Sequence, residues 1–205
     1  MTTISIIGAG NMAAAIGIRA AKHGHAVEIM SRDTAKAKVL ADTIGNGSTV
    51  GTYGSRPAGD IVVVAILFAN SVDVVTHFGE ALAGKVLVDI SNPFNADASG
   101  LVTTEGASIA QQIAAVAPES AQVIKGFNML FRGVIAADKP VDVFFAGGKS
   151  EARERFAALV TSLGMRPRDA GGLEMIWAIE WASIALMGLA RNGAGFDTAL
   201  AAETL

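Results

Sequence analysis

The chain has 205 residues, of which 51% are hydrophobic and 17% charged, and its formal net charge at pH 7 is −3. This composition predicts a large, well-buried α/β core, and the charge gives no electrostatic basis for binding nucleic acid or an anionic membrane. The sequence contains no cysteine, which excludes disulfides, thiolate metal sites and cysteine catalysis. No metal site is expected.

The N-terminal segment lacks the basic region of a signal peptide, and glycines interrupt its apolar run. No stretch reaches 18 uninterrupted apolar residues. We therefore expect a soluble, cytoplasmic protein.

The first elements form a strand, a turn and a helix. Residues 4–7 are a short apolar run typical of a buried parallel strand, and residues 8–13 then fit the pattern G-x-G-x-x-[G/A] before a helix of small residues. Gly8 permits the tight turn, and Gly10 lets a pyrophosphate approach the backbone. A second strand at 26–30 completes a βαβ unit, which makes dinucleotide binding the expected function of this turn. The expected contacts are Gly8, Ala9, Gly10, Asn11 and Met12.

The end of the second strand indicates which dinucleotide binds. NAD-binding proteins usually place an acidic residue there for the ribose 2′-hydroxyl, whereas a 2′-phosphate requires arginine. Here the strand runs into Ser31 and Arg32, and Lys36 follows one turn later. Asp33 is the one residue that argues for NAD. The pattern favours NADP, with the phosphate held by Ser31, Arg32 and Lys36.

Further strands are expected at 49–53, 61–67 and 86–90, with helices between them. The run 61–67 is apolar and β-branched on both faces, as in a buried parallel strand. This repeated βα pattern predicts a Rossmann-type, doubly wound, mostly parallel sheet in an α/β protein. The polar segment 95–106 is expected to be a functional loop.

The second half continues with a helix at 109–116 and strands at 123–126, 141–146 and 165–169. Residues 173–189 form a helix that is apolar almost all round, although Glu174 and Glu180 argue against a membrane span. We expect this helix to cover the sheet and to form part of a homodimer surface. The expected domains are an NADP-binding Rossmann domain, 1–170, and a C-terminal helical extension, 171–205.

Ligands of an open parallel sheet bind beyond the carboxyl ends of its strands. Ile66 and Leu67 end the central strand and are expected to cover part of the dinucleotide. Asn92 and Pro93 end the next strand and are expected near the nicotinamide ribose and carboxamide. Asn128 and Lys125, at the end of the following strand, are the candidate catalytic residues.

Acid–base residues are otherwise scarce. His23 and His25 lie in the turn before the second strand, at the opposite edge of the sheet, and are expected at the surface. A dehydrogenase acting on a hydroxy acid needs a positioned base, whereas transfer between two planar redox rings needs stacking and distance. The sequence favours transfer between rings, and Lys125 keeps the first possibility open.

With these motifs collected, the chain resembles the family of NADP-dependent reductases of the deazaflavin coenzyme (NADPH:8-hydroxy-5-deazaflavin oxidoreductases) and their bacterial dinucleotide-binding relatives. The resemblance rests on the glycine turn at 8–12, on Ser31, Arg32 and Lys36, and on the runs 89–93, 123–128 and 168–171. It implies NADP in the cleft, a second planar ring (deazaflavin or flavin) stacked on the nicotinamide, and a homodimer. Phe131 and Arg132 stand where deazaflavin-specific members have a small, proline-containing wall.

Two alternatives remain open. One is a redox sensor that binds NADPH or NADP without catalysis, and the other is a small-molecule NADP-dependent dehydrogenase. The dehydrogenases that share the opening motif build their substrate site with an extra helical domain, whereas only about 35 residues follow the last expected strand here. The sequence names neither the electron acceptor nor the direction of transfer.

Overall fold

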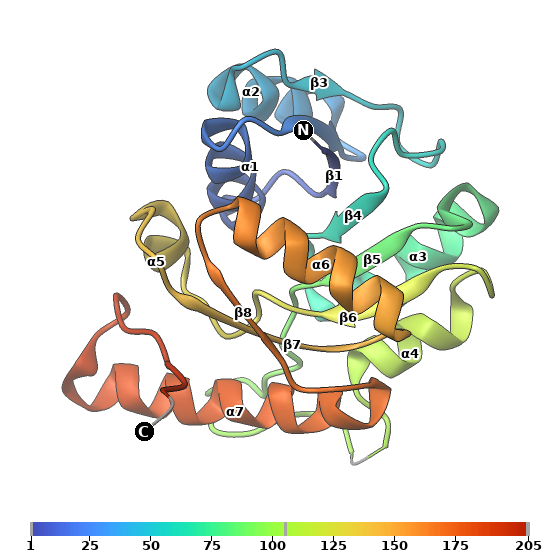
Figure 1. Cartoon of the computed structure of the whole chain (residues 1–205). Coiled ribbons are helices and arrows are strands. Elements are labelled where there is room, and N and C mark those ends of the chain that lie inside the picture. The colour runs from blue at the N-terminus through green and yellow to red at the C-terminus, as the bar shows by residue number, and fades with distance from the viewer. Residues whose placement is uncertain (1, 105, 204–205) are drawn as a thin grey trace.

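A computed structural model describes residues 2–104 and 106–203. Its centre is an eight-stranded sheet with the strand order β3-β2-β1-β4-β5-β6-β7-β8 (Figure 1). Strands β1 to β6 are parallel and occur in the order 3-2-1-4-5-6, which is that of the Rossmann fold. The expected mostly parallel, doubly wound sheet is confirmed. The strands are β1 (Thr3–Ile7), β2 (Ala26–Met30), β3 (Thr49–Val50), β4 (Ile61–Val64), β5 (Val86–Asp89), β6 (Gln122–Lys125), β7 (Asp142–Gly147) and β8 (Arg166–Asp169).

Helices cover both faces of the sheet. One core joins the sheet to α1 (Asn11–Lys22), α2 (Thr34–Ile44), α5 (Arg132–Ala136) and α6 (Ser150–Ser162). The other core joins it to α3 (Ser71–Phe78), α4 (Ile109–Val116) and α7 (Ile176–Leu189). Single turns complete the chain: η1 (Phe68–Asn70), η2 (Gly79–Leu82), η3 (Leu173–Met175) and the π turn η4 (Ala190–Ala194).

The apolar run of β4 shows why the central strands are buried on both sides. Ile61 and Val63 belong to the core beneath α1, whereas Val62 and Val64 belong to the core beneath α3 and α4. Successive side chains of a strand point to opposite faces, so a strand covered twice must be apolar throughout. The run therefore positions β4 at the middle of the sheet, next to the glycine turn.

Two of the predicted strands, 49–53 and 61–67, extend three residues beyond the strands that the structure contains. Strand β3 ends at Val50; Gly51 N–H makes one more bond to Ile29 O, and the chain turns at residues 53–54. Strand β4 ends at Val64, and Ala65 makes one more bond to Ile7 before the chain leaves the sheet. Each strand therefore makes only one further backbone hydrogen bond to its neighbour before the chain leaves the sheet.

The expectation of surface histidines before β2 is wrong for His25. This side chain is buried, and its Nε2 lies 2.9 Å from Ser162 Oγ on α6. Burial lowers the pKa of His25. His23 is exposed, as expected, and its Nε2 lies 2.8 Å from Asp138 Oδ1. Both histidines join α1 and β2 to later parts of the chain, which a local reading of the turn does not reveal.

Arg19 is a buried cation that fastens α1 to the second half of the chain. Its guanidinium donates to the carbonyl oxygens of Leu163, Ile135, Lys139 and Gly164 at 2.8–3.3 Å. A buried guanidinium is tolerated because these acceptors replace its water. The helix that carries the glycine turn is thus held to α5 and to the segments that follow α5 and α6.

Asp138 adds a pH-dependent contact at the same place. Hydrogen bonds from Lys22 and then His23 hold the pKa of Asp138 at about 2, below its ordinary value of 3.8. The stabilisation is therefore complete above about pH 4 and is lost as the pH falls towards 2.

We expect Asp138→Asn to lower the free energy of unfolding at pH 6 by about 1 kcal/mol, after allowance for solvent screening. Urea unfolding at pH 6 and at lower pH measures this difference, which should shrink as the pH falls from about 4 through about 2. Asp73→Asn, at an exposed acid on α3, is the matched control and should show no such trend. An equal difference at every pH contradicts the assignment.

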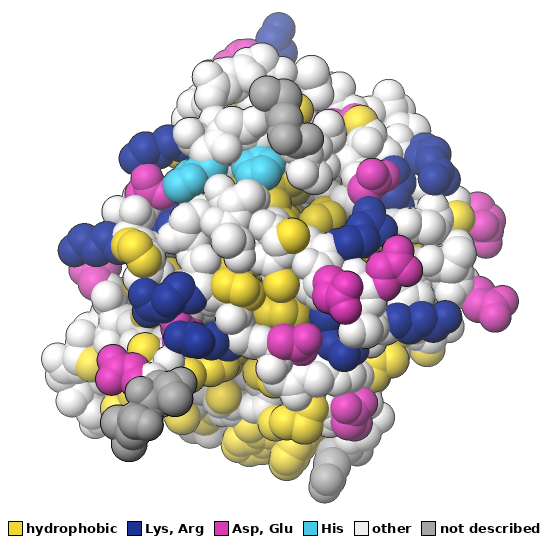
Figure 2. All heavy atoms as spheres, in the orientation of Figure 1, with side chains coloured by type: hydrophobic (Ala, Val, Ile, Leu, Met, Phe, Trp, Pro, Cys, Tyr) yellow, Lys and Arg dark blue, Asp and Glu magenta, His cyan; other side chains and the backbone are white. Residues whose placement is uncertain are grey.

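The C-terminal helix has two different faces. Ile176, Ile179 and Leu186 are buried against the sheet, whereas Trp181 and Leu189 are among its exposed apolar residues. Figure 2 shows hydrophobic side chains gathered along α7, at the lower edge of the view. Among the described residues, one helical run, Leu173–Ala194, is long and apolar enough to cross a membrane by length and composition, and buried core helices pass the same test.

Candidate functional site

The glycine turn lies where β1 and β4 part and the strand order reverses. Gly8 has φ +126°, and a Cβ added there would lie 2.3 Å from the Ala65 carbonyl oxygen. Its N–H donates to Met30 O at 2.8 Å, which joins the turn to β2. Only glycine fits this position without strain.

Gly10 has a different reason to be glycine. It is the N-cap of α1 with φ −94°, which any residue adopts, and an added Cβ meets nothing within 4 Å. No side chain caps the helix and no acidic residue lies in its first turn. The first backbone N–H groups of α1 therefore face open space, with the positive end of the helix dipole, as a pyrophosphate requires.

A cleft of about 470 Å³ extends from this turn along the carboxyl edge of the sheet. It brings together three strand ends that the sequence reading singled out separately, those of β1, β2 and β4. The lining residues include Gly8, Ala9, Gly10, Ser31, Arg32, Lys36, Ile66 and Leu67. Leu67 is 75% exposed, so its apolar side chain is available to cover a ligand.

Asp33, which follows β2, is the one residue whose type argued against NADP, and the structure gives it another role. Asp33 is the N-cap of α2: its Oδ1 accepts from Lys36 N at 3.0 Å, and its Oδ2 lies 3.5 Å from Lys36 Nζ. These hydrogen bonds lower the pKa of Asp33. Its carboxylate therefore caps α2 and pairs with Lys36. Arg32 is exposed in the cleft and forms no ion pair within residues 2–104 and 106–203. Its guanidinium is free to meet a phosphate.

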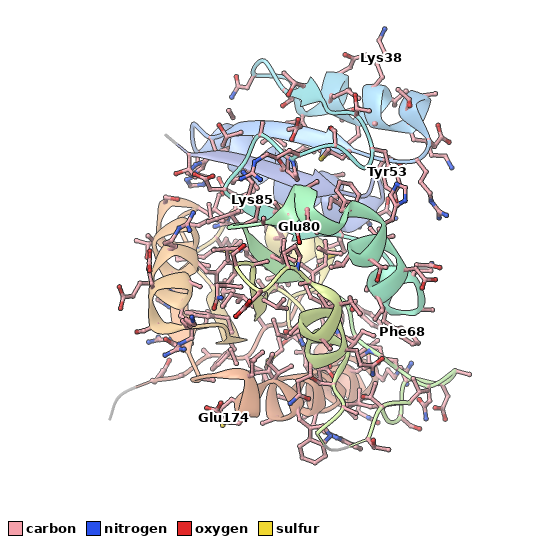
Figure 3. The ribbon with its side chains drawn as sticks, turned by 90° about the vertical axis from the view of Figure 1, so that its right-hand side faces the viewer. Lys38, Tyr53, Phe68, Glu80, Lys85 and Glu174 are labelled. Carbon is pink, nitrogen blue, oxygen red and sulfur yellow. The ribbon has the colours of Figure 1, made fainter. Side chains whose placement is uncertain are left out.

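Tyr53 also lines the cleft, and sequence reasoning missed it as a site residue. Its ring stacks on His77 of α3 with centroids 5.1 Å apart. Burial raises the pKa of Tyr53, and nearby Arg32 opposes that rise. In Figure 3, Tyr53 and Phe68 lie towards the right-hand edge, and Lys85, at the start of β5, lies towards the left. Tyr53 could have been predicted from the rule that ligands bind beyond the carboxyl ends of parallel strands, because it follows β3.

A second, smaller cavity of about 180 Å³ lies at the same edge, beyond Met12. Its walls come from the ends of β5 and β6, from Phe131, and from α7. None of the lining residues carries an ordinarily ionisable side chain. They are Met12, Ile90, Asn92, Phe94, Phe127, Asn128, Leu130, Phe131, Ser183, Leu186 and Met187.

The predicted residues Asn92 and Asn128 meet in this cavity as a reciprocal pair. Asn92 Nδ2 donates to Asn128 O at 2.8 Å, and Asn128 Nδ2 donates to Asn92 Oδ1 at 2.9 Å. Asn128 Oδ1 is buried and has no hydrogen-bond partner among the described residues. A residue that lines this cavity therefore keeps one amide oxygen without a donor.

Lys125 lines neither of these two cavities, contrary to its prediction as a candidate catalytic residue. Its Nζ is fully buried, 2.5 Å from Asp89 Oδ2, 2.8 Å from Ser91 O and 2.9 Å from Glu180 Oε1. Desolvation raises the pKa of Glu180, opposed by Lys125. The sequence pattern placed Lys125 at the correct strand end. Its side chain, however, is buried against Asp89, Ser91 and Glu180.

Two other predicted contacts lie apart from the two cavities. Pro93 is buried, and its carbonyl accepts from Val102 N–H within the loop 95–104; residue 105 of the predicted loop lies outside the described residues. Asn11 lines a separate hollow between α1 and α2 that also touches Gly10 and Lys36. The α7 residues of the second cavity were missed, because helix periodicity alone does not show which face meets a distant strand end.

The fold and the cleft together define a Rossmann-type dinucleotide-binding protein. Residues 3–93 match the family described as "NADP oxidoreductase coenzyme F420-dependent". This match covers the N-terminal part of the chain and agrees with the resemblance drawn from the motifs, so the chain is similar to NADP-dependent oxidoreductases.

Three similar proteins illustrate the range of relatives. The F420-dependent NADP reductase of Methanocaldococcus jannaschii is 29% identical over 64% of this chain and 62% of its own length. Metalloreductase STEAP3 of Rattus norvegicus is 25% identical over 86% of this chain, which spans 35% of that protein. The solved structure of a putative F420-dependent NADP reductase from Arthrobacter sp. FB24 is 24% identical, with a TM-score of 0.81 over 94% of this chain and 95% of the other; it supports the fold.

Proposed function

We propose that the protein binds NADP(H) across the two cavities. Ser31, Arg32 and Lys36 would hold the 2′-phosphate, and the first turn of α1 would hold the pyrophosphate. Ile66 and Leu67 would cover the bound dinucleotide beside β4. The open space at Gly10, which a Cβ would fill, supports this fit.

We further propose that the enzyme transfers a hydride between NADPH and a second planar redox cofactor, a deazaflavin or a flavin. The observation that carries this proposal is the second cavity, whose lining has no group able to donate or accept a proton near pH 7. Two redox rings need no such group, because each carries its own electronics. The walls formed by Phe94, Phe131 and Met187 suit a flat apolar ring.

The nicotinamide supplies hydride chemistry when the dinucleotide is bound. The chain's own part is to fix the ring and keep water from it. Asn92 and Asn128 would orient the ribose and carboxamide, and Met12 and Leu186 would exclude water from the ring. This division of roles follows the general case in which proteins supply position and electrostatics for a redox cofactor.

Two alternatives keep specific support. A redox sensor that binds NADPH without catalysis fits the same absence of acid–base groups. A small-molecule NADP-dependent dehydrogenase would need a proton donor from solvent or from its substrate, since the burial of Lys125 removes the candidate base. The acceptor test below separates these three.

We also propose that residues 1–170 act as the NADP-binding domain and 171–205 as a helical extension of it. The exposed apolar face of α7, with Trp181 and Leu189, supports a homodimer. A cytoplasmic location remains part of this proposal.

The test is an acceptor panel followed by absorbance at 340 nm, with NADPH and the protein held constant. Oxidation of NADPH on addition of a deazaflavin or a flavin is the expected result and names the partner. Binding of NADPH with no oxidation by flavins, deazaflavins or quinones favours the sensor. Turnover with a small carbonyl or imine compound alone favours the dehydrogenase.

A further inference from the structure

The buried Lys125 belongs to a closed ring of polar contacts beneath the second cavity. Lys125 Nζ donates to Ser91 O, and Ser91 precedes Asn92, which pairs with Asn128. Asn128 Nδ2 also lies 3.4 Å from Ile179 O on α7, and Glu180, the next residue, returns to Lys125 at 2.9 Å. The ring thus joins the ends of β5 and β6 to the C-terminal helix.

The ring holds the backbone of Ser91, the residue before Asn92, at both its N–H and its carbonyl group. Asp89 Oδ1 accepts from Ser91 N–H at 2.9 Å, while its Oδ2 accepts from Lys125. Ser91 O accepts from Lys125 as well. Both polar backbone groups of Ser91 are therefore tied to one ion pair, so Asn92 has little freedom to move.

The ring also fixes which atom of Asn128 is offered to a ligand. The Nδ2 end faces two acceptors, Asn92 Oδ1 and Ile179 O, so reversing the amide would place three oxygens together. The Oδ1 end is left as the free acceptor among the described residues. A buried acceptor without a partner is unfavourable unless a ligand donates to it.

We propose that Lys125, clamped between Asp89 and Glu180, is a positioning residue of the nicotinamide site, and that its ring of contacts holds Asn128 Oδ1 to accept an N–H from the carboxamide. This inference rests on the proposed function. It makes α7 an integral wall of the site, since Glu180 closes the ring and Ser183 and Leu186 line the cavity.

The experiment compares two ligands that share the adenosine half. NADPH would occupy both cavities, whereas 2′,5′-ADP would occupy only the cleft at Arg32. Glu180→Ala opens the ring yet leaves the Lys125–Asp89 pair neutral, so the variant is expected to fold. We expect calorimetry to show NADPH binding weakened about tenfold and 2′,5′-ADP binding changed less than twofold.

Three variants sharpen the result. Glu180→Gln keeps a polar group within reach of Lys125 and should restore most of the NADPH affinity. Lys125→Met leaves two buried carboxylates without their cation. The folded variant should lose more NADPH affinity than Glu180→Ala and should keep its affinity for 2′,5′-ADP. Lys85→Met, at a buried lysine paired with Asp60 on the opposite edge, should bind both ligands as the wild type does.

Equal loss of both ligands in Glu180→Ala, or no loss of either, overturns the positioning role. Failure of the wild-type protein to bind NADPH and 2′,5′-ADP instead overturns the proposed function itself. The two failures are therefore distinguishable in one set of titrations.

Discussion

Replacing Gly8 by alanine is expected to destabilise the fold by about 2–4 kcal/mol, because the left-handed backbone and the overlap with a main-chain oxygen both oppose a side chain. The added Cβ would lie 2.3 Å from Ala65 O, an atom of the sheet that cannot move aside cheaply. β1 and β4 would have to separate at the centre of the sheet. A fall in melting temperature of about 5–15 °C is the corresponding result.

Gly10→Ala is the matched comparison for this change. Its backbone suits alanine and its Cβ meets nothing within 4 Å, so the melting temperature should stay within about 1 °C of the wild type. NADPH affinity should nevertheless fall about tenfold or more, because the methyl group occupies the approach of the pyrophosphate. Thermal unfolding and calorimetry on both variants measure these opposite patterns. Wild-type NADPH affinity in Gly10→Ala would contradict the assignment of the turn.

Arg32→Ala is expected to weaken NADPH binding about 10- to 100-fold while changing NADH binding less than about threefold. The guanidinium makes charge-assisted hydrogen bonds that only the 2′-phosphate can accept, and losing one or two of them corresponds to about 1.5–3 kcal/mol. Arg32 has no competing ion pair in the described residues. Calorimetry with both dinucleotides measures the ratio.

Lys38→Ala is the control for the loss of one positive charge. Lys38 lies on α2, at the top of Figure 3, where its side chain points away from the rest of the molecule. It should leave the preference for NADPH unchanged. If both variants lose affinity equally, the effect is one of overall charge and the phosphate site lies elsewhere.

The N-terminal half was readable from sequence because its signals are local. The strand, the glycine turn and the helix that follow one another at 3–22 each have their own pattern, and the rule that ligands lie beyond parallel strand ends combined Gly8, Arg32 and Ile66 into one site. The structure brings these residues to one cleft. Asp33 was ambiguous only because an N-cap and a ribose ligand can be the same residue type.

The second cavity was only partly readable because its contacts join distant residues. In the sequence, Glu180 served only as evidence against a membrane span. In the structure it forms an ion pair with Lys125, 55 positions earlier in the chain. Lys125 looked like a base at a strand end, whereas its burial depends on α7 packing over it. No periodicity or propensity encodes such a pairing, since both residues are compatible with an exposed position until the helix is placed.

The same reasoning applies to His25. Its flanking glycine and its position before β2 are typical of an exposed turn, but α6 supplies Ser162 from 137 residues away. Lys125, Glu180 and His25 were misjudged for this same reason. Each is polar, each is buried, and each has a partner that only the tertiary fold supplies.

Calorimetric titration of the wild-type protein with NADPH and, separately, with NADH tests the proposed dinucleotide site. We expect one NADPH to bind per chain, at least tenfold tighter than NADH, because the cleft ends in Ser31, Arg32 and Lys36. Equal affinity for the two would contradict the phosphate site, and absence of binding by both would contradict the dinucleotide cleft from which every other inference follows.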